Sequence, residues 1–211
     1  MKKFLCVLMV LSVMLCFSGC KSKAAKLAEE QIAALGTVTL DSADAVAAAK
    51  AAYEALPLKQ QAYVTNFYLI TVAEMDYQNL LYDQQAREIE QMIHDLRPVT
   101  MGSAEALAHA EEVYNSADIS VKLKVNNLSD MVYAFQLFDF MRTDAIEAQI
   151  YAIGPVTLES GPKIEAAQKA LDDAEPKIRN AVYNTYSLLE AQEEFARLQA
   201  EAAGTETEPT E

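Results

Sequence analysis

Apolar residues in this chain recur at steps of three and four, which is the period of an amphipathic α-helix. One clear stripe is formed by Ile70, Ala73, Tyr77 and Leu80, and similar stripes occur along most of the sequence. Between residues 20 and 203, the glycines and prolines all fall between the stripes and not within them. Because glycine and proline interrupt helices, this pattern predicts an all-α protein.

A Val-Thr-Leu-x-Ser motif at residues 38–42 recurs with small changes at residues 99–103 and 156–160. The three serines are 61 and then 57 residues apart, and the agreement extends far beyond the motif. Four residues after each serine, for example, the chain has an aliphatic side chain: Val46, Leu107 and Ile164. The chain therefore contains three copies of one structural unit.

Each repeat is predicted to be a three-helix bundle with a short extra helical turn, which falls at Lys59–Val64 in the first copy. Polar residues that recur between the stripes are predicted helix N-caps; at the serines, the alternative is that the neighbouring residue takes this role. They are Ser42, Ser103 and Ser160 before the second helix, and Asn66, Asn127 and Asn184 before the third. Small residues recur within the third helix, where they would allow another helix to approach closely: Ala73, Ala134 and Ala191.

Two stretches without glycine or proline, Phe67–Leu96 and Leu128–Ile153, are each long enough to serve two repeats. Their lengths differ by about one helical turn, as do the repeat lengths. We therefore expect the three bundles to be joined by continuous long helices in an elongated molecule. The predicted boundaries are 26–80, 81–141 and 142–203 for the repeats, and 204–211 for a disordered acidic tail.

The N-terminus has the features of an export signal. Lys2 and Lys3 precede an apolar run, Phe4–Phe17, that is too short to span a membrane. The following Ser18-Gly19-Cys20 resembles a bacterial lipobox. This resemblance implies removal of residues 1–19 and thioether lipidation of Cys20 with at least two acyl chains, followed by a linker at 20–25. The alternatives are an ordinary secretory signal with a coincidental cysteine, and an uncleaved anchor.

Composition limits the possible partners. The formal net charge is −14, and it becomes −16 when Lys2 and Lys3 leave with the signal. A chain this acidic is a poor binder of nucleic acid, which requires a basic surface. Cys6 and Cys16 also lie in the signal, so a lipidated Cys20 would leave no free thiol.

The repeat resembles the tandem VTL-x-S helical modules of cell-surface proteins in Gram-positive bacteria, and more distantly the GA and FIVAR-type modules of adhesins. The first repeat carries the whole pattern. The second lacks the glycine before the motif, having Pro98 in that stretch and Met101 for leucine, and the third has Leu171 for tyrosine. The resemblance implies spacers or modules that bind proteins or glycans, and not enzymes. It transfers no functional residue.

Two Glu–His pairs could in principle hold a metal ion if neighbouring helices brought them together. They are Glu90 with His94, and Glu105 with His109. We expect two solvated histidines instead, because the other repeats have residues such as Ala33 and Tyr151 at these positions. The sequence offers no catalytic constellation and no cofactor motif.

The tyrosines divide into two groups. Tyr53, Tyr77 and Tyr114 lie on the apolar stripes and are predicted core residues. Tyr68 and Tyr186 occupy equivalent positions that could form an exposed aromatic patch. These features predict a non-catalytic interaction or spacer protein, lipid-anchored on the extracytoplasmic side of the cell membrane. Its partner would be an envelope or host protein, or a glycan. The alternative is an anchored helical accessory protein that binds a small ligand or metal between its helices.

Overall fold

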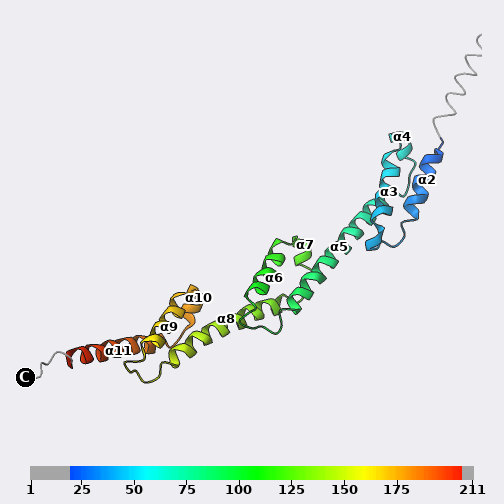
Figure 1. Cartoon of the computed structure of the whole chain (residues 1–211). Coiled ribbons are helices and arrows are strands. Elements are labelled where there is room, and N and C mark those ends of the chain that lie inside the picture. Colours follow the sequence, from blue (N-terminus) through cyan, green and yellow to red (C-terminus); the bar gives the residue numbers. More distant parts are fainter. Residues whose placement is uncertain (1–19, 206–211) are drawn as a thin grey trace, which may run out of the picture. The chain divides into compact units, whose positions relative to one another are not determined.

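The computed structural model describes residues 20–205, and all regular secondary structure in this range is helical (Figure 1). The predicted all-α class is therefore confirmed. The predicted signal peptide at 1–19 and residues 206–211 of the predicted tail lie outside the described residues.

The α-helices lie between the repeated motifs, as the sequence pattern predicts. Three of them are one-turn or short helices that correspond to the extra turn predicted in each repeat. In chain order, the elements are α2 (Lys23–Ala33), η1 (Leu40–Ser42), α3 (Ala43–Glu54), α4 (Leu58–Gln61), α5 (Tyr68–His94), α6 (Ala104–Ser116), α7 (Ile119–Lys122), α8 (Leu128–Tyr151), α9 (Gly161–Asp172), α10 (Pro176–Ala181) and α11 (Thr185–Thr205).

Two boundaries differ from those expected. The helix α2 begins at Lys23, so the predicted linker at 20–25 is helical over its second half. The helix α11 continues through Gly204 to Thr205, into the predicted tail. The described residues divide into two compact units, with the boundary between Ala86 and Arg87.

The two long helices are continuous, as predicted. α5 has 27 residues and α8 has 24, and both run unbroken through their middle turns, which contain Gln84 and Thr143. Each buries residues near both ends and none in the middle. In α5 these are Ile70 and Ala73, then Ala86, Ile89 and Ile93; in α8 they are Met131 and Ala134, then Ile146 and Ile150. One helix thus contributes apolar side chains to two separate stretches of core.

In the first unit, α2 packs along α3, and the start of α5 completes the core. The buried cluster consists of Ala25, Ala28, Ile32, Ala49, Leu56, Val64 and Ile70. Tyr53 lies at its edge, where its ring stacks on that of Phe67 with the centroids 5.8 Å apart. Tyr53, Tyr77 and Tyr114 are each only partly buried. Tyr53 thus packs against the core as predicted, but none of the three is fully buried, because a tyrosine can bury its ring edge while its hydroxyl stays near water.

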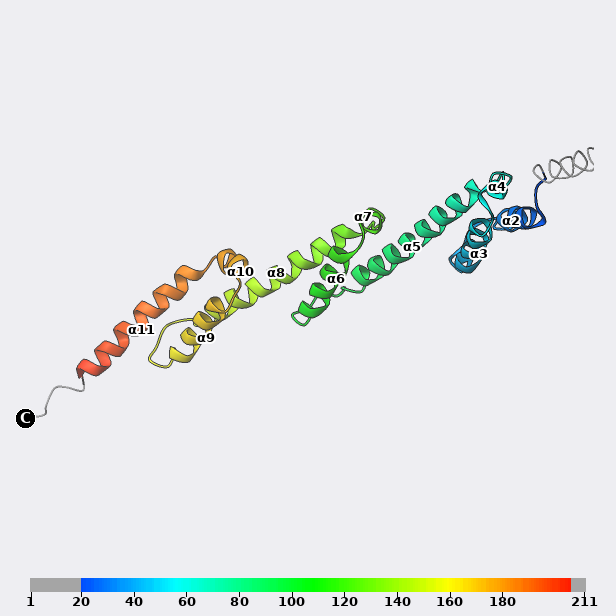
Figure 2. The same cartoon turned by 90° about the horizontal axis from the view of Figure 1, so that it is seen from above.

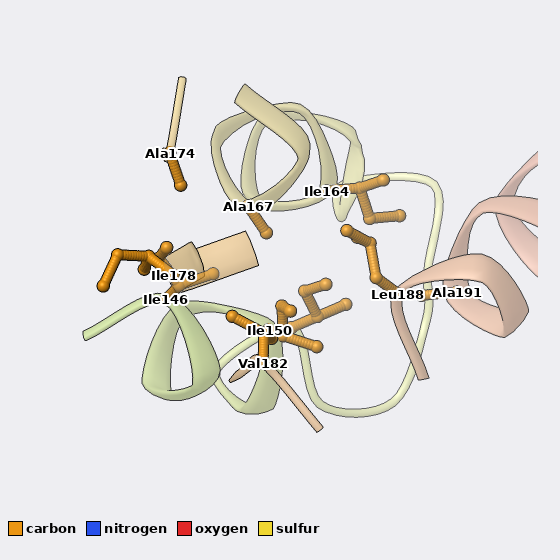
Figure 3. Packing of buried hydrophobic residues seen from close by; sticks show 10 residues of the cluster. Ile146, Ile150, Ile164, Ala167, Ala174, Ile178, Val182, Leu188 and Ala191 are labelled. Atoms are coloured by element: carbon orange, nitrogen blue, oxygen red, sulfur yellow. The ribbon is translucent and has the colours of Figure 1, made fainter. Parts of the chain in front are cut away.

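In the second unit, α9 packs against α8 and α11 (Figure 2). The cluster between them contains Ile146, Ile150, Ile153, Ile164, Ala167, Ala174, Ile178, Val182, Leu188 and Ala191. Figure 3 shows Ala167 and Leu188 directed into the space shared by these helices. The small positions of the third helix, Ala73, Ala134 and Ala191, are all buried, as predicted.

The Val-Thr-Leu-x-Ser turn has the same hydrogen bonds in each copy. The serine hydroxyl accepts the N–H of the threonine three residues earlier, at 2.9 Å in the first two copies and 3.0 Å in the third. The pairs are Thr39 with Ser42, Thr100 with Ser103, and Thr157 with Ser160. Each serine stands at the N-cap position, but its side chain makes no hydrogen bond to the helix that follows. The predicted N-cap position is therefore confirmed, but the hydroxyl does not cap the helix; it closes the turn on its N-terminal side.

Candidate functional site

A glutamate stands 13 residues before the serine of each motif, in the helix that precedes it: Glu29, Glu90 and Glu147. In each repeat its carboxylate accepts a hydrogen bond from a backbone N–H 36 residues further along the chain. The donors are Thr65 at 3.0 Å, Asn126 at 2.8 Å and Tyr183 at 3.1 Å. The carboxylate thereby ties this helix to the segment before the third helix of the same repeat.

The residue after each donor is the recurring asparagine. Its side-chain N–H donates to the main-chain carbonyl of the same glutamate, at 2.9 Å for Asn66 and Asn127 and 3.0 Å for Asn184. We call this pair of contacts the Glu–Asn clamp: Glu29 with Thr65 and Asn66, Glu90 with Asn126 and Asn127, and Glu147 with Tyr183 and Asn184. Asn127 occupies the N-cap position of α8 without capping it. The predicted role of the asparagines is thus corrected from helix cap to cross-helix tie.

The glutamates of the clamp were not identified from the sequence as a recurring feature. The sequence does contain evidence for this recurrence, because Glu29, Glu90 and Glu147 are separated by the same 61 and 57 residues as the serines. The spacing does not indicate which residue donates to each carboxylate, because the donor lies 36 residues further along the chain.

A second recurring contact satisfies carbonyls at the end of the second helix of each repeat. Its donor changes from copy to copy. The contacts are Gln61 to the carbonyl of Glu54 at 3.4 Å, Lys122 to Asn115 at 2.7 Å and Arg179 to Asp172 at 2.7 Å. These carbonyls lack a partner within the helix, and a cation there also suits the helix dipole. The donor side chain thus differs between the three copies, but each copy keeps a hydrogen bond to the same carbonyl position.

The electrostatics of the clamp are clearest at Glu29. Its carboxylate also pairs with the Lys21 ammonium and accepts the Thr65 hydroxyl at 2.7 Å. The Lys21 hydrogen bond, followed by those from the Thr65 backbone and hydroxyl, lowers the pKa of Glu29 to about 2. All of these donors favour the ionised carboxylate.

The four candidate metal ligands are either exposed to solvent or hydrogen-bonded to a neighbouring residue. Glu90 accepts the Asn126 N–H in the clamp, and His109 and Glu105 are exposed. His94 is exposed, and its Nδ1 lies 3.2 Å from Oδ1 of Asp95. Among residues 20–205, no group of three or more His, Cys, Asp or Glu side chains is placed to hold a metal ion.

Cys20 is exposed and lies three residues before α2. The intervening segment is held in place, because the Ser22 N–H donates to Oε1 of Gln60 at 2.8 Å. The Ser22 hydroxyl in turn caps α2 by accepting the Ala25 N–H at 3.1 Å. The sulfur is therefore accessible, and its attachment to the first helix is short. Within the part of the chain that the structure describes, no helix combines the length and apolarity that crossing a membrane requires.

Grooves lie beside the clamps of the first and third repeats. The first, of about 440 Å³, is lined by Lys21, Lys26, Glu29, Glu30, Ala33 and Asn66. The other, of about 490 Å³, lies between α8 and α10 and is lined by Asp139, Phe140, Thr143, Asp144, Glu147, Lys177, Ile178, Ala181 and Tyr183. The candidate patch residues Tyr68 and Tyr186 are exposed, but neither lines these grooves. Such hollows provide surfaces for non-covalent binding.

A scan against protein-family models, a search of curated proteins and a search of solved structures find no match to this chain.

Proposed function

We propose that this chain is a lipid-anchored, extracytoplasmic interaction or spacer protein without catalytic activity. It would be built from three equivalent three-helix modules, the repeats at 26–80, 81–141 and 142–203, which share α5 and α8 at their joins. The observation that carries this proposal is the threefold recurrence of the Glu–Asn clamp and of the Thr–Ser turn, with different exposed residues around them. A single active site does not require three copies of its scaffold, whereas a spacer or multi-surface binder uses each copy.

The anchoring part of the proposal depends on Cys20. An exposed sulfur next to a helix that is tied down by Ser22 would hold the first module close to the membrane surface. Two acyl chains would make the attachment stable, since each buried methylene contributes about 0.8 kcal/mol.

The Cys20→Ala variant tests the anchor. It should release the protein from the membrane fraction into the medium, or leave the precursor unprocessed. Cell fractionation and intact-protein mass spectrometry measure both outcomes. The matched control is Cys16→Ala, which lies four residues earlier and should retain processing and membrane attachment. Unchanged mass and membrane retention in Cys20→Ala would contradict lipidation at this residue.

The interaction part of the proposal is tested by affinity capture. The full chain, immobilised at its C-terminus, should retain a defined protein or glycan from envelope or host fractions. A chain in which one module's exposed residues are exchanged for those of another should lose that partner. A pure spacer would retain nothing and would tolerate the exchange.

A further inference from the structure

We propose that the groove between α8 and α10 binds a basic peptide segment of a partner protein and receives one of its Lys or Arg side chains. We call it the aromatic groove and define it by Asp139, Phe140, Asp144, Glu147, Ile178 and Tyr183. This inference rests on the proposed interaction function and names the chemistry of its partner.

The apolar surface of the groove comes from both helices. Ile178 on α10 belongs to the core cluster and is only 2% exposed. Phe140 on α8 is 66% exposed, and Tyr183, just after α10, is 81% exposed. Large aromatic side chains that border a hollow of about 490 Å³ provide faces against which a ligand can pack.

The charges in the groove favour a cationic ligand. Three carboxylates line it, from Asp139, Asp144 and Glu147, against the single ammonium of Lys177. Lys177 pairs with Asp139 at 3.1 Å, and Glu147 accepts the Tyr183 N–H. Asp144 is exposed and has no ion-pair partner within the described residues. A Lys or Arg side chain could therefore pair with Asp144 while its cation lies against an aromatic ring.

The other two repeats have different residues at three of these positions, Phe140, Asp144 and Tyr183. Counted from the serine of each motif, Phe140 corresponds to Ser22 and Asp83, and Tyr183 to Thr65 and Asn126. Asp144 corresponds to Lys26 and Arg87, so the charge is reversed in both other copies. The Glu–Asn clamp forms in all three repeats despite these differences. The two aromatic side chains and Asp144 therefore occur only in the third repeat, whereas Glu147 recurs as Glu29 and Glu90. A neutral glycan could stack on the same rings, but it would gain nothing from the excess of carboxylates, so we favour the basic peptide.

The test uses the full chain in detergent micelles and a fluorescent hexa-arginine peptide at about 150 mM salt, where long-range attraction is screened. Fluorescence anisotropy gives the dissociation constant. The double variant Phe140→Ser with Tyr183→Thr introduces the residues of the first repeat and leaves the net charge unchanged. It should weaken binding about tenfold, since two cation–aromatic contacts are lost. Asp144→Lys should weaken it at least as much.

The matched controls are Tyr151→Ser and Tyr186→Thr, which remove exposed tyrosines outside the groove and should change the affinity less than about twofold. Absence of peptide binding, equal binding by the double variant, or an equal loss in the controls would overturn the inference. Displacement of the peptide by neutral oligosaccharides at lower concentration than by free arginine would overturn it in favour of a glycan site. Membrane attachment through Cys20 is measured separately, so failure of the groove and failure of the anchor are distinguishable.

Discussion

At the residue scale, the Glu–Asn clamp uses one residue to provide two acceptors. The glutamate side chain accepts a backbone N–H, while its main-chain carbonyl, already in a helix, accepts an asparagine amide through its second lone pair. Hydrogen bonds to a charged group contribute about 1.5–3 kcal/mol, and neutral ones about 0.5–1.5 kcal/mol. The carboxylate contacts are exposed, so the part-buried asparagine contact is expected to stabilise the proposed modules more than the glutamate contact does.

Removing the amide of Asn127 tests the clamp. Asn127→Ala deletes the donor to the Glu90 carbonyl, and we expect a loss of about 1–2 kcal/mol in the free energy of unfolding. Urea denaturation followed by circular dichroism measures this loss. The control is Asn115→Ala, whose side chain is exposed on α6. If both variants were equally stable, the amide contact would have no energetic role.

The low pKa of Glu29 predicts an acid-sensitive clamp. Its pKa is about 2 in the folded chain against an ordinary value of 4.5, so the folded state favours the ionised form. Its stabilising contribution is therefore complete above pH 4.5 and is lost as the pH falls towards about 2. The difference in Tm between the wild type and Glu29→Gln should be largest near neutral pH and should shrink over this window. A difference that is independent of pH would contradict the assigned pKa.

At the scale of the elements, the sequence predicts helix identity well and capping poorly. α5 and α8 follow from long stretches without glycine or proline, in which nothing interrupts the helical hydrogen bonds. The serine and asparagine side chains do not cap the following helices, because a short polar side chain can also bond to backbone on its other side or to another helix. Ser42 turns back to Thr39, and Asn66 reaches across to Glu29. The aromatic groove joins residues of α8 to residues 31 to 44 positions later in the chain, a contact that no local pattern indicates.

The packing of α9 against α8 and α11 buries Ala167 completely, with 0% of its surface exposed. Ala167→Leu should lower the free energy of unfolding by about 1–3 kcal/mol, because the added methylenes must displace neighbouring core residues. The adjacent Ala166 lies on the exposed face of the same helix, so Ala166→Leu is a closely matched control. Chemical denaturation distinguishes the two. Equal stability would mean that the buried face of α9 is assigned to the wrong residues.

At the scale of the whole molecule, comparing the three repeats shows which positions recur in every copy and which differ between copies. Core and clamp positions recur, while exposed positions change in charge: Lys26, Arg87 and Asp144 are equivalent by their distance from the motif serine. With a formal net charge of −14, the chain repels anionic surfaces and attracts basic partners. A chain of related modules can thus present different binding surfaces on one scaffold.

Such a chain should also unfold in parts, because stability in repeat proteins is carried by each unit and its immediate neighbours. The buried clusters of the two compact units share no residue, and each contains a large side chain that is almost fully buried: Ile32 in the first and Leu188 in the second. Truncation of either to alanine should cost about 2–5 kcal/mol within its own unit. Native-state hydrogen exchange measured by mass spectrometry should therefore show faster exchange in α2 and α3 for Ile32→Ala, and in α9 and α11 for Leu188→Ala. The amides of the other unit should keep their wild-type rates in each variant. A uniform increase across both units in either variant would mean that the chain unfolds as one cooperative body, and would contradict the modular energetics.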